Sequence, residues 1–356
     1  MKIMSVVGAR PQFVKLAPIA HACARAGVEH VVVHTGQHYD PMLSDVFFED
    51  LRIPPPDEHL GVGSGSHGVQ TGAMLAAMDE VILKHRPDWV LVYGDTNSTL
   101  AAALSAVKLH FPVAHLEAGL RSFNREMPEE INRVVTDHCA DLLLAPTDVA
   151  LAHLTTEGLA ERTVVVGDVM TDVCLATRDA VAGKPSPIME ELGLPEGGYY
   201  LATIHRPANT DSREQLEAVL DSLGAVDAPV VILAHPRLVA KAAEHGIEIS
   251  RGNLVAHPPL AYPDLVASAL HARGVITDSG GLQKEAFLLR TPCTTVRPQT
   301  EWVETVELGW NVLAEPGPAL VAAAQRPRPA DTQEAPYGDG AAADRVVAVL
   351  QERCRA

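Results

Sequence analysis

Short runs of apolar and β-branched residues alternate along the chain with longer segments whose apolar positions recur at helical spacing. In the first half the apolar runs are IMSVVG, EHVVVHT, DWVLVYG, PVAHLEAG, DLLLAPT and TVVVGD. Helical patterns such as FVKLAPIAHACARAG and STLAAALSAVKLH lie between them. This alternation predicts right-handed βαβ units and a parallel sheet covered by helices on both faces.

The alternation breaks at GKPSPIMEELGLPEGG, a segment rich in Pro and Gly that we interpret as a linker. It then resumes with the runs YYLATIH, VVILAH, NLVAHP, GVITDSGG and CTTV, and with helices expected from about Ser212 and from Tyr262. Near the end, PGPALVAAAQRPRPADTQEAPYGDG is predicted to be a low-complexity loop, and AAADRVVAVLQERC an amphipathic helix.

We therefore predict an α/β fold with two Rossmann-like, doubly wound parallel-sheet domains, which also suits a chain of 356 residues. The predicted boundaries are an N-terminal domain at 1–182, a linker at 183–198, a C-terminal domain at 199–340 and a terminal helix at 341–356. Doubly wound sheets bind ligands at the carboxyl ends of their strands, so we expect a site in the cleft between the domains.

Charge and composition narrow the class of partner. The formal net charge of −17 argues against nucleic acid as a partner, because a protein that binds nucleic acid needs a basic face. The five cysteines are scattered and form no C-x-x-C pair, which favours reduced thiols and excludes a cysteine zinc site. No signal sequence and no apolar run long enough to span a membrane is evident, so we expect a cytoplasmic protein without a membrane partner.

In the first half, charged residues follow the predicted strands. GARPQFVK places Arg10 and Lys15 at a helix start, which suits a phosphate but lacks the G-x-G-x-x-G fingerprint of dinucleotide binding. Asp95 and Glu117 follow two further strands, and Glu129 lies in the first turn of a helix that begins at about Pro128. Asp95 also suits an N-cap and Glu129 the helix dipole, but clustered carboxylates can serve as acid and base.

The second half supplies cations and a Gly-rich turn. His205 and Arg206 end one strand, and His235 and Arg237 end the next. ITDSGGLQKEA places Ser279, Gly280 and Gly281 before a helix that holds Glu285. Backbone amides in such a turn can approach an anion closely, and a glutamate one turn later can reach a sugar diol. The histidines lack metal-ligand spacing, so no metal is expected. Together the two halves suit a nucleotide diphosphate sugar.

GARPQFVK, YGDTNST, HLEAGLR, MPEEINR and DSGGLQKEA occur in this order, and together they resemble the non-hydrolysing UDP-N-acetylglucosamine 2-epimerases. The resemblance covers nearly the whole chain except the linker and the loop at 326–340. It implies the glycosyltransferase-B architecture and interconversion of UDP-GlcNAc and UDP-ManNAc by elimination of UDP to 2-acetamidoglucal and re-addition. It also implies no cofactor, a homodimer, and a terminal helix that packs back on the first domain.

The same resemblance assigns roles to residues of this chain. The catalytic residues it implies are Asp95, Glu117 and Glu129, which match the acid/base carboxylates of the family, and His205, which matches its essential histidine. The set it implies for UDP binding is Arg10, Lys15, Leu260, Tyr262, Ser279, Gly280, Gly281 and Glu285, and we add His235 and Arg237 because they follow a strand of the same half. Arg121 and Arg133 are expected to partner and orient the carboxylates.

The chain departs from the family pattern at several positions. HRPAN has Ala208 where the family has Glu, and TEWVE (Thr300 to Glu304) replaces T-E-R-P-E. QHYD (Gln37 to Asp40) replaces the Q-H-R-E that helps hold an activating UDP-GlcNAc, and Gly72 replaces a downstream Arg. We therefore predict weak or missing activation by substrate; a rate that is sigmoidal in UDP-GlcNAc would contradict this.

Alternative functions remain open at this point. QHYD, QTGAML and TEWVE also resemble a branch that acts on UDP-2,3-diacetamido-2,3-dideoxy-glucuronate. A hydrolysing relative would release free ManNAc and UDP, and a glycosyltransferase of the same architecture would share the UDP pocket. The set of three carboxylates favours an epimerase over a transferase or a non-catalytic binding protein.

Overall fold

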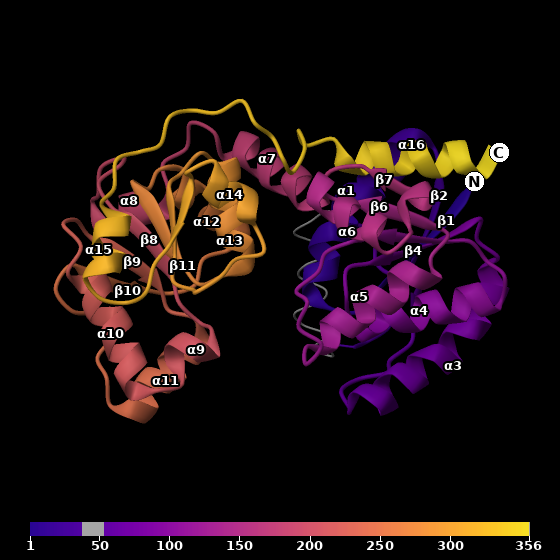
Figure 1. The fold of residues 1–356 in the computed structure, drawn as a ribbon, viewed down its shortest axis with the longest axis horizontal. Coiled ribbons are helices and arrows are strands. Elements are labelled where there is room, and N and C mark those ends of the chain that lie inside the picture. The colour runs from indigo at the N-terminus through magenta and orange to yellow at the C-terminus, as the bar shows by residue number, and fades with distance from the viewer. Residues whose placement is uncertain (38–52, 356) are drawn as a thin grey trace. The chain divides into compact units, whose positions relative to one another are not determined.

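The computed structural model describes residues 1–37 and 53–355, apart from the side chains of Arg10 and Arg355. The chain divides into two compact units, Met1–Val173 with Ala335–Ala356 and Cys174–Glu334. Each unit is built on its own parallel sheet (Figure 1). The predicted fold of two doubly wound α/β domains is confirmed.

The sheet of the first unit has, within the described residues, seven strands in the order β3-β2-β1-β4-β5-β6-β7. Their bounds are β1 Lys2–Val7, β2 Glu29–His34, β3 Glu58–His59, β4 Trp89–Tyr93, β5 Val113–Leu116, β6 Leu142–Ala145 and β7 Thr163–Val165. The strand order reverses between β1 and β4, which is where doubly wound folds place their ligands.

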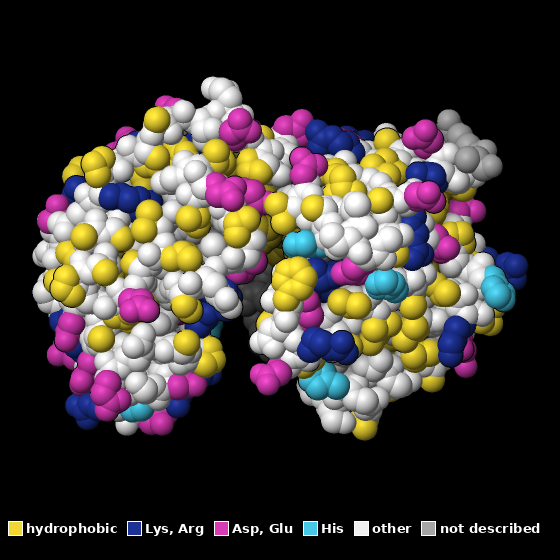
Figure 2. Space-filling view, in the orientation of Figure 1, with side chains coloured by type: hydrophobic (Ala, Val, Ile, Leu, Met, Phe, Trp, Pro, Cys, Tyr) yellow, Lys and Arg dark blue, Asp and Glu magenta, His cyan; other side chains and the backbone are white. Residues whose placement is uncertain are grey.

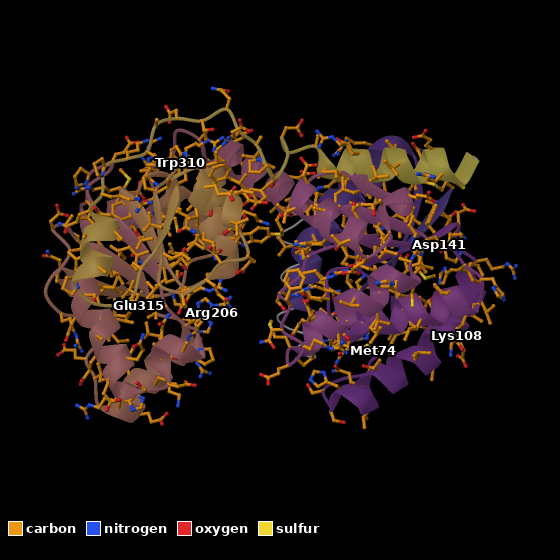
Figure 3. All side chains as sticks on the ribbon, in the orientation of Figure 1. Met74, Lys108, Asp141, Arg206, Trp310 and Glu315 are labelled. Carbon is orange, nitrogen blue, oxygen red and sulfur yellow. The ribbon has the colours of Figure 1, made fainter. Side chains whose placement is uncertain are left out.

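Helices cover both faces of this sheet (Figure 1). They are α1 Arg10–Ala26, α3 His67–His85, α4 Asn97–Lys108, α5 Pro128–Cys139, α6 Asp148–Thr156, α7 Val169–Val181, of which the first part belongs to this unit, and α16 Ala342–Arg355. Although it is last in the chain, α16 packs against α1, and its Val346 and Leu350 share a core with Leu16 and Ile19. On the other face, α3, which carries the buried Met74 (Figure 3), contributes Met78 and Ile82 to a second core.

The second unit repeats this plan, with a described sheet in the order β10-β9-β8-β11-β12-β13. Its strands are β8 Tyr200–Thr203, β9 Val230–Leu233, β10 Leu254–His257, β11 Gly274–Thr277, β12 Cys293–Thr295 and β13 Asn311–Leu313. Its helices are α8 Pro187–Leu192, α9 Pro207–Thr210, α10 Arg213–Gly224, α11 Pro236–His245, α12 Tyr262–Leu270, α13 Gly280–Leu288, α14 Val303–Glu307 and α15 Pro318–Ala324. Here the order reverses between β8 and β11.

Four short elements differ from the sequence prediction. The prediction that 316–340 is wholly a loop is wrong, because PALVAAA forms α15 and buries Leu320. The short strands β3 and β13 were not predicted. Helix α8 lies inside the segment predicted as a linker, where Ser186 caps it by accepting a hydrogen bond from the Met189 amide. These elements are two to seven residues long, too short to show a hydrophobic period.

The surface carries charges of both signs. Figure 2 shows Lys and Arg side chains lying singly or in small groups among Asp and Glu on the visible face of each unit. Cations that serve an anionic ligand must therefore be placed individually at the site. Within the described part of the chain, no helix has both the length and the apolar character to cross a membrane.

Candidate active site

The carboxyl ends of β1 and β5 bring a lysine and a glutamate together in the first unit. Lys15, in the second turn of α1, forms an ion pair with Glu117, which follows β5, and each side chain is only 14% exposed. Burial favours the neutral amine, but the attraction of Glu117, with smaller contributions from Asp95 and Asp168, raises the pKa of Lys15. The predicted phosphate-binding lysine thus holds one of the predicted catalytic carboxylates.

The backbone around Glu117 is unusual. Glu117 has a φ of 70°, in the left-handed region that non-glycine residues seldom adopt. Strained backbone of this kind costs about 1–3 kcal/mol and is concentrated at functional sites. A Cβ atom added to Gly94, which follows β4, would lie 3.1 Å from Glu117 Oε2 and 3.5 Å from Lys15 Nζ. The glycine therefore leaves room for the ion pair.

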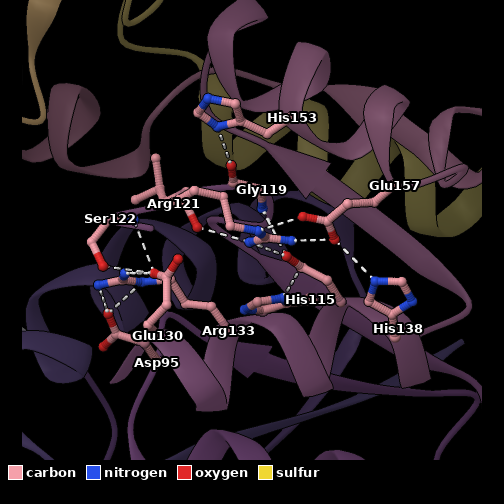
Figure 4. A network of polar contacts seen from close by, with 12 residues as sticks. Asp95, His115, Gly119, Arg121, Ser122, Glu130, Arg133, His138, His153 and Glu157 are labelled. Atoms are coloured by element: carbon pink, nitrogen blue, oxygen red, sulfur yellow. Dashed lines mark hydrogen bonds and ion pairs between the residues drawn. The ribbon is translucent and has the colours of Figure 1, made fainter. Parts of the chain in front are cut away.

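Asp95 lies next to Gly94 and is bound by Arg133 of α5 (Figure 4). Arg133 donates to Asp95 Oδ2 from Nε (3.0 Å) and Nη2 (2.8 Å), and to Glu130 Oε2 from Nη1 (2.6 Å). Burial opposes the charge, but Asp95 and Glu130 raise the pKa of Arg133 above its ordinary value. The predicted pairing of Arg133 with a carboxylate of the site is confirmed.

The two adjacent glutamates of α5 have different environments. Glu130 is 3% exposed and accepts hydrogen bonds from the amides of Ser122 and Phe123, each at 2.9 Å. Glu129 is exposed, and its carboxylate forms no hydrogen bond or ion pair with the residues that the structure describes. Its carboxylate is accessible to a ligand. Arg10 begins α1, but its side chain lies outside the described residues.

A buried polar network lies behind these carboxylates (Figure 4). Asp137 Oδ1 lies 2.7 Å from His115 Nδ1, and Asp137 Oδ2 lies 2.7 Å from Arg121 Nη1. Arg121 also binds Glu157, so the prediction that it orients a catalytic carboxylate is wrong. Burial opposes ionisation, but His115 and Arg121 lower the pKa of Asp137. Sequence reasoning missed Asp137 and His115, although His115 stands two residues before Glu117.

In the second unit, Asp278 organises the end of β8. It is fully buried and accepts hydrogen bonds from the amides of His205 (3.0 Å) and Arg206 (2.9 Å). Its Oδ1 also lies 3.4 Å from His205 Nδ1. Asp278 was not predicted, although it directly precedes the Ser-Gly-Gly turn. The predicted catalytic His205 is therefore held by a buried carboxylate and remains one-third exposed.

His235 and Arg237 lie at the end of β9. The His205 and His235 rings are 5.0 Å apart between centroids, and burial together with His205 and Arg237 lowers the pKa of His235. His235 Nδ1 accepts from the Arg237 amide at 3.1 Å and so caps α11. Arg237 pairs with Asp211, which means that a ligand would have to compete for its guanidinium.

Tyr262 and Glu285 are joined directly. Tyr262 Oη donates to Glu285 Oε1 at 2.9 Å, and Glu285 is 8% exposed. Burial, followed by the charge of Glu285, raises the pKa of Tyr262. The tyrosine therefore stays a hydrogen-bond donor that fixes one oxygen of the carboxylate. Leu260 packs partly buried against the same core as Tyr262.

The turn at the start of α13 is open on one side and occupied on the other. Ser279 caps the helix, and no heavy atom lies within 4 Å of a Cβ added to Gly281. A Cβ on Gly280 would collide with the carboxylate of Glu301, which pairs with Arg297 at 2.9 Å. The TEWVE segment therefore reaches this turn.

Arg206 (Figure 3) stands at the end of β8, beside the same turn. One of its guanidinium nitrogens, Nη2, lies 3.6 Å from the position of the added Gly280 Cβ. Burial and the neighbouring Arg297 lower the pKa of Arg206. The turn thus has two arginines, and sequence reasoning had not singled out Arg297.

A metal centre has no support in the described part of the chain, where no group of three or more His, Cys, Asp or Glu is arranged to hold an ion. The first unit offers carboxylates and a lysine for chemistry, and the second unit offers histidines, arginines and helix amides.

Known proteins match this chain over nearly its whole length. The family model for UDP-N-acetylglucosamine 2-epimerase matches residues 21–351. A UDP-N-acetylglucosamine 2-epimerase homolog of Methanococcus maripaludis is 46% identical over 88% of both chains. The UDP-2,3-diacetamido-2,3-dideoxy-D-glucuronate 2-epimerase of Pseudomonas aeruginosa is 43% identical over 98% of this chain and 99% of its own.

A solved structure agrees with these sequence matches. The UDP-GlcNAc 2-epimerase of Methanocaldococcus jannaschii, in complex with UDP-GlcNAc and UDP, superposes with a TM-score of 0.84. It is 37% identical to this chain, and the match covers 99% of this chain and 100% of the other. The fold, the strand-end carboxylates and these matches agree, and the chain belongs to the UDP-N-acetylglucosamine 2-epimerase family, a family of isomerases.

Proposed function

We propose that this chain interconverts UDP-GlcNAc and UDP-ManNAc by inverting carbon 2 of the sugar. The observation that carries the proposal is the placement of Asp95 and Glu117 at the ends of neighbouring strands, each paired with a cation. Proton removal and return need groups of this kind within reach of one carbon atom. The solved family structure with UDP-GlcNAc bound supports the choice of substrate.

The reaction proceeds by elimination and addition. A carboxylate takes the proton from carbon 2, the bond from carbon 1 to the UDP oxygen breaks, and 2-acetamidoglucal forms. A proton then returns to the opposite face of carbon 2 while the UDP oxygen attacks carbon 1 again. Asp95, Glu117 and the exposed Glu129 are the proposed acid/base groups of the first unit, and they contribute about 10²–10⁴-fold for each positioned proton transfer.

The second unit serves the leaving group. His205 and the amides of Gly280 and Gly281 face the diphosphate, where negative charge develops as the bond to carbon 1 breaks. Glu285, fixed by Tyr262, accepts hydrogen bonds from the ribose hydroxyls, and the backbone around Leu260 reads the uracil. Lys15 and Arg10 add positive charge from the first unit.

Proton NMR of the purified protein with UDP-GlcNAc in deuterium oxide tests this proposal. We expect new UDP-ManNAc signals, with deuterium in place of the proton at carbon 2 in both sugars. Release of free ManNAc with UDP would instead identify a hydrolysing enzyme. Binding of UDP without any exchange at carbon 2 would contradict the proposal for this substrate.

UDP-2,3-diacetamido-2,3-dideoxy-glucuronate is the second candidate substrate. It is favoured by the 43% identity to the Pseudomonas aeruginosa enzyme over almost the full length of both chains. This sugar carries a carboxylate at carbon 6 and a second acetamido group at carbon 3. Comparing kcat/KM for both sugars in the same deuterium-exchange assay separates the two candidates.

We further infer that the enzyme works as a homodimer in the cytoplasm. The family resemblance supports the dimer, and five free cysteines suit a reducing compartment. Light scattering coupled to size-exclusion chromatography measures the mass in solution; a mass near 38 kDa, that of one chain, would contradict the dimer.

A further inference from the structure

His115 is a fully buried histidine in β5, two residues before Glu117. Its Nε2 atom lies 2.7 Å from the carbonyl oxygen of Gly94, and its Nδ1 atom lies 2.7 Å from Asp137 Oδ1. A carbonyl only accepts, so Nε2 donates to Gly94. A carboxylate likewise only accepts, and that of Asp137 is also bound by the Gly119 amide and Arg121, so Nδ1 donates as well. The ring is therefore fixed at both ends.

The Gly94 carbonyl that accepts from His115 belongs to the turn after β4. Gly94 ends the β4 segment with a φ of 61°, and its amide donates to Leu116 O at 3.0 Å. The next residue is Asp95, and the face of Gly94 lies against Glu117 and Lys15. A shift of this turn therefore moves one proposed acid/base carboxylate and changes the space around the other.

We propose that His115 is a positioning residue for the proton transfers at carbon 2. By donating to the Gly94 carbonyl it fixes the turn that presents Asp95, and by donating to Asp137 it ties that turn to the loop that carries Glu117. The ring itself does not touch the substrate. This inference rests on the proposed function, because it assigns the turn to proton transfer.

Two substitutions separate positioning from a general role in stability. In H115N the side-chain amide nitrogen falls near the place of Nδ1, so the contact with Asp137 remains and the Gly94 carbonyl is released. In H115Q the amide nitrogen falls near the place of Nε2, so the contact with Gly94 remains and Asp137 loses a donor. Loss of a partner from the buried, charged Asp137 destabilises more than loss of one from a carbonyl.

The order of the two variants in kcat should therefore be the opposite of their order in melting temperature. We expect H115N to lose about 30–100-fold in kcat, as a misplacement near 1 Å does, with KM and the Kd for UDP within about twofold of wild type. H115Q should have the lower melting temperature but keep kcat within about tenfold. The proposal would be overturned if the variant with the lower melting temperature also had the lower kcat. Should H115N fail to fold, a loss of 100-fold or more in H115Q overturns it.

Hydrogen exchange read by mass spectrometry tests the same idea without any turnover. We expect faster exchange of the Gly94 amide region, peptide 93–97, in H115N, and wild-type exchange in H115Q. Unchanged exchange there in H115N overturns the positioning role. By contrast, wild-type enzyme that exchanges no proton at carbon 2 of either candidate sugar overturns the proposed function. Amide exchange of peptide 93–97 then still shows whether His115 holds the Gly94 turn.

Discussion

Lys15 and Glu117 form an ion pair that is largely withdrawn from water, and such a pair differs from one on the surface. Removing one member of a buried pair leaves the other charge uncompensated, at about 3–5 kcal/mol. Removing both charges together avoids that penalty. The pair is therefore a sensitive point for stability as well as for chemistry, and the two contributions can be separated.

The variant K15M should unfold more easily by about 3–5 kcal/mol, because Glu117 is left buried without its cation. The double variant K15M/E117Q should recover most of that loss but remain inactive, since it lacks a proposed acid/base group. Urea denaturation gives the free energies of unfolding, and a double-mutant cycle gives the coupling. Additive effects of the two substitutions would contradict a strong interaction.

Single residues also show how far sequence reasoning reaches. Asp95, Glu117 and Lys15 were predicted because their positions follow from strand ends, and the structure brings Lys15 and Glu117 into contact. Asp278 binds the amide of His205 from 73 positions away, and Asp137 binds His115 from 22 positions away. Such pairings depend on which strands and helices lie side by side. Arg121 was wrongly assigned for the same reason, because its partner Glu157 comes from another segment.

At the scale of elements, the first turn of α5 divides two roles between two adjacent glutamates. Glu130 turns inward and ties the amides of Ser122 and Phe123 to the helix, and it also binds Arg133, which holds Asp95. Burial opposes its ionisation, but these hydrogen bonds lower the pKa of Glu130. Glu129 stays exposed. The sequence MPEEINR shows both residues equally, and only the direction of the helix face separates them.

The variants E129Q and E130Q should therefore behave oppositely. E129Q should lower kcat by about 10²–10⁴-fold, as loss of an acid/base group does, while the melting temperature stays within 2 °C or so of wild type. E130Q should lose about 1–3 kcal/mol in unfolding free energy, because the buried side chain no longer offers a charged acceptor to Arg133 and to the Ser122 and Phe123 amides. Thermal melts and deuterium exchange at carbon 2 provide the two readouts. A stable, inactive E130Q would reverse the assignment.

Element prediction succeeded for runs that were long enough to show a period. The runs IMSVVG and DWVLVYG became β1 and β4, and the pattern after Thr96 became α4, capped by the Thr96 hydroxyl. The strand β3 has only two residues, too few to show a period, and it is recognised only by its pairing with β2. The segment PALVAAA has the composition of a low-complexity loop, but it forms α15, and its Leu320 packs into a core of the second unit.

At the scale of the whole molecule, several acidic groups have pKa values below their ordinary ones. In Glu157 the hydrogen bond from Arg121 lowers the pKa against the effect of burial, and His115 and Arg121 lower that of Asp137. A depressed pKa in the folded state stabilises the protein above the ordinary value of the group. That contribution is lost as pH falls through the folded value. Acid should therefore weaken the first unit.

We expect the free energy of unfolding to fall steadily below pH 4.5, the ordinary value for Glu157, and further below 3.8, that for Asp137. The variant E157Q should be less stable than wild type at pH 7, and this difference should shrink as pH falls towards 3. Urea titrations at a series of pH values measure it. A difference that stays constant from pH 7 to 3 would show that Glu157 does not contribute through its charge.

The two units carry different chemistries, and this division can be measured. Asp95 belongs to the unit that offers carboxylates, whereas Glu285 belongs to the unit that offers the Gly-rich turn and the tyrosine-bound acid.

We expect D95N to bind UDP with a Kd within about twofold of wild type but to lose about 10²–10⁴-fold in kcat. E285Q should raise the Kd for UDP by about tenfold or more, as loss of a charged hydrogen bond of about 1.5–3 kcal/mol does. Titration calorimetry with UDP and deuterium exchange at carbon 2 separate the two effects. E214Q, altered on α10 of the second unit, is the matched control for E285Q, because the same charge is removed from an exposed position on another helix. If D95N lost UDP binding as strongly as E285Q, Asp95 itself would help to hold the nucleotide, and its assignment to proton transfer alone would be wrong.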